Sequence, residues 1–132
     1  MVPRHPLRSG NTVRLAHPIV FVMDLGNPDA LIPDLQPGTV SATSSCVSVR
    51  ALADPDGDVT VRLERAPSQL AEGLTEVFRG AVETPTGRLA IVTSENQRVA
   101  DIEVGARRTE VRIAVDAPDH PCQIVVAVVG AP

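Results

Sequence analysis

The sequence has almost no aromatic residues and no lysine. Phe21 and Phe78 are the aromatics among 132 residues, and all twelve basic residues are arginine. A nucleic-acid-binding domain is expected to carry net positive charge, clustered basic residues and aromatics for stacking. This chain has a formal net charge of -4 and dispersed arginines. The composition therefore argues against nucleic-acid binding, and the lack of Trp and Tyr argues against the aromatic platforms of sugar-binding sandwiches.

Long apolar runs are also absent. The longest, Ile124 to Val129, is far shorter than the roughly 18 residues of a membrane-spanning segment. Residues Met1 to Gly10 hold prolines and a glycine where a secretory signal would need an apolar stretch. We therefore expect a cytoplasmic protein without membrane contact. Its two cysteines, Cys46 and Cys122, are expected to be reduced and buried, because reducing compartments seldom keep structural disulfides.

Signatures of catalysis and of tightly bound ions are missing as well. The sequence has no GxSxG nucleophile motif, no Cys/His zinc spacing and no glycine-rich phosphate loop. Asp54, Asp56 and Asp58 resemble a calcium loop, but Val59 and Arg65 stand where an EF-hand needs glycine and glutamate. We expect no cofactor, no metal and no enzymatic activity. The alternatives are a small-ligand or Ca²⁺-binding sandwich that uses this turn and, third, an enzyme with an unrecognised site.

Short segments of alternating polarity fill the rest of the chain. Val59–Leu63 and Val111–Val115 alternate apolar and polar residues with the period of two that half-buried strands have. Eight further segments follow the pattern less strictly: Thr12–Ala16, Ile19–Met23, Thr39–Thr43, Val47–Leu52, Val77–Thr84, Arg88–Thr93, Val99–Val104 and Gln123–Val129. Turn residues separate them at spacings typical of a sandwich or barrel.

The pattern predicts the fold class. We expect one all-β domain over residues 1–132, an antiparallel β-sandwich of about 8–10 short strands with at most one short helix near Pro67. Residues 1–10 are expected to be frayed. Gln123–Val129 is apolar on both faces, which predicts a central strand. The segment Asp54–Asp58 combines proline and glycine and predicts a hairpin between its flanking strands.

One ordered set of features carries a family resemblance. The apolar segment His17–Asp24 opens on histidine and ends on an acid, and a long acidic connection with prolines follows, with Gly38 before the next strand. The later features are the expected hairpins Val47–Leu63 and Glu76–Val92 and a strand pair from Glu110 to Val129. Over residues 12–129 this order resembles the competence protein J family, small inhibitors of a DNA-entry nuclease. The resemblance implies a β-sandwich that binds a protein partner, such as a nuclease, without chemistry of its own.

The connection from Asn27 to Gly38 is the candidate functional segment, because long loops on a rigid scaffold can carry function. Asp24, Asp29 and Asp34 lie close together in the sequence here. If the partner is a nuclease, these carboxylates are the expected partner-binding residues, since an acidic surface complements a basic substrate cleft. An exposed strand edge would in addition permit a homodimer.

Overall fold

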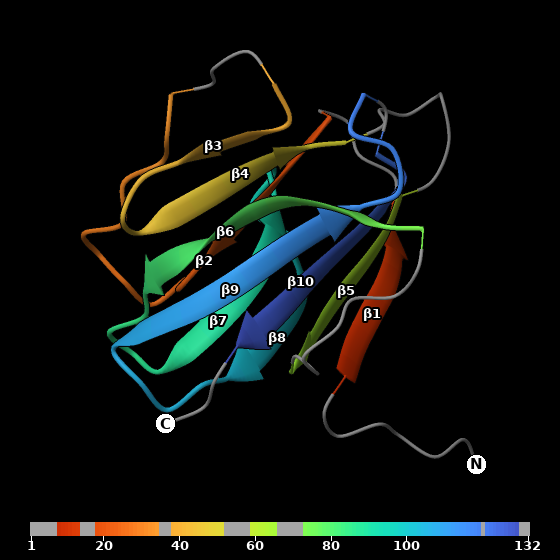
Figure 1. The fold of residues 1–132 in the computed structure, drawn as a ribbon. Helices are drawn as coiled ribbons and strands as arrows, with labels where there is room; N and C mark the ends of the chain where they lie inside the picture. Colours follow the sequence, from red (N-terminus) through yellow and green to blue (C-terminus); the bar gives the residue numbers. More distant parts are fainter. Residues whose placement is uncertain are drawn as a thin grey trace.

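The computed structural model describes residues 8–13, 18–34, 38–51, 59–65, 73–119 and 121–129. These residues form ten strands and no helix. The strands build two five-stranded sheets that pack face to face (Figure 1). The predicted all-β sandwich is therefore confirmed. In the described part of the chain there is accordingly no helix with the length and hydropathy of a membrane span.

The two sheets draw their strands from all along the chain. The first sheet contains, in spatial order, β1 (Arg8–Val13), β5 (Val59–Arg65), β10 (Gln123–Val129), β9 (Arg108–Val115) and β6 (Thr75–Glu83). The second contains β3 (Val40–Ala42), β4 (Cys46–Arg50), β2 (Ile19–Met23), β7 (Arg88–Thr93) and β8 (Arg98–Glu103). The pairs among these strands are antiparallel except for β5 with β10, which is parallel, so the sandwich is mostly but not wholly antiparallel.

Two predicted hairpins are wrong. β4 belongs to the second sheet and β5 to the first, so the connection between them crosses from sheet to sheet. The same holds for β6 and β7, whereas the predicted late pair, β9 with β10, is confirmed. Alternation with period two shows which face of a strand is buried. It does not show which sheet the strand joins, because both sheets of a sandwich bury an apolar face. The residues of the predicted Asp54–Asp58 turn and of the helical turn near Pro67 lie outside the described ranges.

The first described residues of the chain form an edge strand of the first sheet. Fraying is expected over residues 1–10, of which residues 1–7 lie outside the described ranges. From Arg8 opposite Glu64 to Val13 opposite Val59, β1 pairs with β5. Gly10 therefore lies within a strand. Arg8–Val13 has no alternating apolar pattern, because this edge strand consists largely of polar residues and glycine.

The core lies between the inward faces of the two sheets, where aliphatic side chains meet without aromatics at its centre. Its largest fully buried members are Leu63, Leu89, Ile91, Ile113 and Ile124, accompanied by valines from both sheets. β10 occupies the middle of the first sheet, as predicted, and buries residues on both of its faces: Ile124 and Val126 toward the core, Val125 and Ala127 away from it.

The two cysteines are free thiols in different surroundings. Cys46 is fully buried in β4, and burial raises the pKa of its thiol to about 12. Cys122 is half-buried, and its Sγ donates a hydrogen bond of 2.8 Å to Oδ2 of Asp116. This bond to a carboxylate is the main cause that raises the pKa of the Cys122 thiol. Cys46 therefore meets the expectation of a buried thiol, and Cys122 does so in part.

We predict that the two thiols differ in reactivity. The thiolate is the reactive species, and a rise in pKa from 9 to about 12 lowers the thiolate fraction of Cys46 about 1,000-fold near pH 8. In a Cys122→Ser variant, Cys46 should react with a thiol reagent very slowly in buffer and rapidly in urea. A Cys46→Ala variant, which retains Cys122, is the matched control and should react faster in buffer. Rapid native labelling of Cys46 would contradict its burial.

Candidate protein-interaction loop

The connection that follows β2 displays apolar and acidic side chains together. We call residues 24–34 the β2–β3 loop. Among the described residues, the exposed large hydrophobic side chains are Leu25, Leu31 and Ile32, which are 41%, 63% and 54% exposed. All three lie in this loop. Asp29 and Asp34 are exposed there too, and the loop contains no basic residue.

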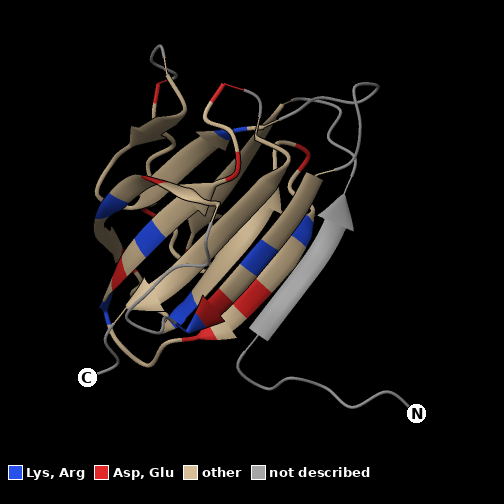
Figure 2. Cartoon of the chain, turned by 45° about the vertical axis from the view of Figure 1, so that its right-hand side comes forward, with Lys and Arg blue, Asp and Glu red and all other residues tan. Residues whose placement is uncertain are grey.

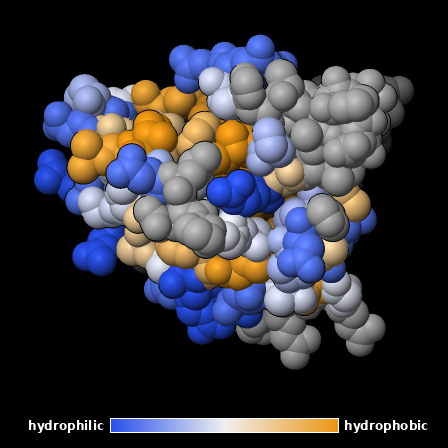
Figure 3. Space-filling view, turned by 90° about the horizontal axis from the view of Figure 1, so that it is seen from above, coloured by the Kyte–Doolittle hydropathy of each residue, from blue (hydrophilic) through white to orange (hydrophobic). Residues whose placement is uncertain are grey.

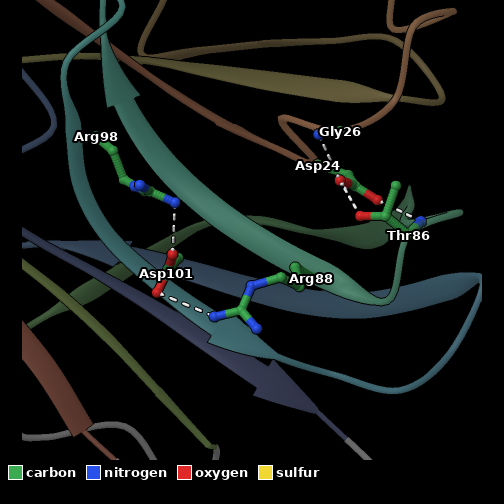
Figure 4. Close-up of polar contacts among 6 residues, drawn as sticks. All are labelled: Asp24, Gly26, Thr86, Arg88, Arg98 and Asp101. Atoms are coloured by element: carbon green, nitrogen blue, oxygen red, sulfur yellow. Dashed lines mark hydrogen bonds and ion pairs between the residues drawn. The ribbon is translucent and has the colours of Figure 1, made fainter.

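Asp24 holds the beginning of this loop. Its Oδ1 accepts hydrogen bonds from the Gly26 N–H (2.9 Å) and the Thr86 hydroxyl (2.6 Å), and its Oδ2 accepts one from the Thr86 N–H (2.7 Å) (Figure 4). The residue is 1% exposed. A buried carboxylate is stable when hydrogen-bond donors surround it, and here they come from the loop itself and from the turn between β6 and β7. We call this arrangement the Asp24 latch.

The loop packs closely against this turn. A Cβ atom on Gly26 would lie 2.7 Å from Cγ2 of Thr86, so glycine is the residue that lets the two segments approach. Beyond it, the Asn27 N–H donates to the Asp24 carbonyl (3.1 Å) and the Asn27 side chain accepts from the Asp29 N–H (3.0 Å). Local bonds of this kind favour a compact turn over a freely moving loop.

A second set of hydrogen bonds holds the far side of the loop. The Leu31 N–H donates to Oγ of Ser45 (2.7 Å), and the Leu31 carbonyl accepts from Oγ1 of Thr43 (2.6 Å). Ser45 is 1% exposed, and Pro33 is buried two residues after Leu31. Both backbone polar groups of Leu31 are thus fixed to the segment before β4 while its side chain projects into solvent.

The structure separates the three predicted partner-binding residues. Asp29 and Asp34 are exposed on the loop. Asp24 is buried, and both of its carboxylate oxygens are hydrogen-bonded within the protein. The sequence could not show this, because the donors of Thr86 lie 62 residues away. Asp24 therefore holds the beginning of the loop, and the partner-binding role of the three aspartates stays a prediction.

A small pocket lies at the base of the loop, and sequence reasoning missed the charged residues that line it. Asp24, Leu25 and Gly26 form one side. On the other side, the carboxylate of Asp101 in β8 forms ion pairs with Arg98 (3.0 Å) and Arg88 (3.5 Å) (Figure 4). The register of β7 and β8 places Asp101 opposite Ala90, between the two arginines, and only strand pairing could have revealed this.

The charges elsewhere on the strands are mixed in sign. Figure 2 shows basic and acidic residues interspersed over the sheet that faces the viewer. On the first sheet, Arg112 pairs with Glu76, and Arg62 with Glu64. Hydrogen bonds from Arg112 lower the pKa of the Glu76 carboxyl. The β2–β3 loop differs from this balanced surface, since its charges are all negative.

The structure also bears on the metal alternative for the residues it describes. Within those ranges, no three His, Cys, Asp or Glu side chains gather closely enough to hold a metal ion. Asp54, Asp56 and Asp58 lie outside the described residues, so the Ca²⁺-binding alternative stays a prediction.

We predict that the Asp24 latch contributes to stability. In Asp24→Asn, an amide group replaces one accepting oxygen and leaves a donor of Thr86 or Gly26 without its partner. The free energy of unfolding should fall by about 1–3 kcal/mol, the usual cost of an unsatisfied buried polar group. Urea unfolding measures this change. The exposed Asp29→Asn is the matched control, expected within about 0.5 kcal/mol of wild type. Equal stabilities of the two variants would refute the latch.

Comparison with known proteins places the fold. No protein-family model and no curated protein sequence matches the chain. Among solved structures, it is similar to ComJ from Bacillus subtilis, an inhibitor of the DNA degrading activity of NucA, with a TM-score of 0.67 and 8% identity over 92% of this chain and 95% of that one. It is also similar to the product of crocagin biosynthetic gene J, with a TM-score of 0.60 and 13% identity over 95% and 97% of the two chains. The expected resemblance to competence protein J is thereby confirmed at the level of the fold.

Proposed function

We propose that this protein is a non-enzymatic binding domain that inhibits a nuclease by covering its DNA-binding surface. The observation that carries the proposal is the β2–β3 loop, a hydrogen-bonded segment that exposes apolar and acidic side chains, on a fold shared with ComJ, an inhibitor of NucA. Interfaces gain affinity when the contacting segment is already ordered before binding. The latch at Asp24 and the hydrogen bonds to Leu31 provide that order.

Charge complementarity selects the kind of partner. A nuclease that binds the phosphates of DNA needs a basic substrate surface. Asp29 and Asp34 present negative charge on the loop, and the chain as a whole has a formal net charge of -4. Complementary potentials speed the encounter of two proteins and disfavour wrong partners. In this proposal the two exposed aspartates steer the domain to the basic surface that DNA would otherwise occupy.

The fold alone does not decide the function, because one fold can serve unrelated activities. The crocagin biosynthetic protein shares this fold under a description that mentions no nuclease. The proposal therefore needs an activity measurement. We would follow degradation of linear DNA by NucA, and by a NucA-like nuclease from this protein's own source organism, with increasing amounts of the purified domain.

The expected result is inhibition of at least one of these nucleases that saturates at an equimolar ratio. The heat-unfolded domain is the control for non-specific effects of an acidic chain and should not inhibit. If neither nuclease is inhibited or bound at micromolar concentrations, the proposed function is wrong.

We predict that the exposed aspartates act on the association rate. The double variant Asp29→Asn/Asp34→Asn should lower kon for the inhibited nuclease about tenfold at low ionic strength, with a smaller effect at high salt. Glu95→Gln/Glu110→Gln, which changes the net charge equally at exposed positions outside the loop, is the control. Equal kon values for the two double variants would show that net charge, and not the loop, steers association.

A further inference from the structure

The apolar side chains of the β2–β3 loop need an explanation of their own. Leu31 and Ile32 are adjacent in sequence and more than half exposed, and Leu25 is exposed at the other end of the loop. Isolated apolar residues on a surface are ordinary, but the exposed large hydrophobic residues of the described chain are concentrated in this one segment. Apolar residues are also visible on the surface seen from above in Figure 3.

These side chains are held outward by the backbone. The Leu31 N–H and carbonyl both bond to the segment before β4, and the buried Pro33 fixes the chain just after Ile32. A loop free to move could turn its apolar side chains toward the protein. Here the hydrogen bonds of Leu31 would have to break first, so the exposure of Leu31 belongs to the folded conformation itself.

The charges around these side chains select the occupant. Asp29 and Asp34 flank Leu31 and Ile32 in the sequence, and no basic residue lies between them. A second copy docked loop to loop would bring like charges together, and an anionic membrane surface would repel the same carboxylates. A protein surface with an apolar depression rimmed by basic side chains would bury the apolar side chains of the loop. Its basic rim would attract Asp29 and Asp34.

We infer that Leu31 and Ile32 are the anchors of the interface, inserted into an apolar depression on a partner whose rim is basic. The inference rests on the proposed function and assigns the affinity to these two side chains. Anchor residues at the centre of an interface dominate binding, while charged residues at the rim act mainly on the association rate. The anchors therefore govern koff, and Asp29 and Asp34 govern kon.

The test compares the wild type with Leu31→Ser/Ile32→Ser against the nuclease that the domain inhibits. We expect koff to rise about 30-fold or more, as for hot-spot residues, with kon within about threefold of wild type. The melting temperature should not fall, because both side chains are exposed. Ala42→Ser/Ala117→Ser, which makes two exposed apolar positions outside the loop polar, is the matched control and should leave koff unchanged.

The outcomes distinguish the inference from the proposed function. If the wild type binds neither nuclease, both are overturned. If it binds and the Leu31/Ile32 double variant dissociates at the wild-type rate, the inference is overturned and the proposed function stands. Sedimentation of the domain alone tests the second-copy occupant. A wild-type dimer that the double variant abolishes would assign these side chains to self-association and overturn the inference.

Discussion

A single buried carboxylate, Asp24, fixes the point at which the loop leaves the sandwich. Its oxygens accept hydrogen bonds from the loop and from the turn that joins β6 to β7, and β6 and β7 belong to different sheets. Removing a charge from water is costly unless donors replace the lost hydration, and the three hydrogen bonds supply that replacement. Asp24 thus fixes the first residues of the β2–β3 loop. The hydrogen bond from the Leu31 N–H to Oγ of Ser45 fixes the far side of the loop.

The β2–β3 loop and the two sheets differ in which side chains they bury and expose. The two sheets bury aliphatic side chains between them and expose a surface of mixed charge, which suits a stable support with little preference for a partner. The loop does the opposite, since it exposes apolar side chains and charges of one sign, while several of its backbone groups, those of Leu31 among them, are hydrogen-bonded within the protein. The loop and the two sheets therefore expose different kinds of surface. The solved structures that share this fold are only 8% and 13% identical to the chain, so the fold persists through large changes in sequence.

Asp24 shows that residues close together in the sequence can have different surroundings in the fold. It stands with Asp29 and Asp34 in one acidic stretch, and sequence reasoning gave all three the same role. Burial separates them, because Asp24 directly follows β2, whose neighbour β7 begins just after the turn that supplies the donors of Thr86. Arg88 follows the same turn and lines a pocket together with Asp24. Arg98 and Asp101 of β8 line this pocket too, and no motif in the sequence groups these residues with Asp24.

The sequence by itself determined where the strands after β1 lie and which of their faces are buried, because alternation with period two is a local property of the chain; the polar edge strand β1 lacks this pattern. It also determined that Gln123–Val129 is central, since a strand apolar on both faces is best covered on both sides. Only the tertiary structure decided that β4 and β5, like β6 and β7, lie in different sheets, and that β5 and β10 run parallel. It alone decided that Asp24 is buried and Leu31 displayed. These outcomes depend on hydrogen-bond partners distant in sequence, Thr86 for Asp24 and Ser45 for Leu31, which no local pattern encodes.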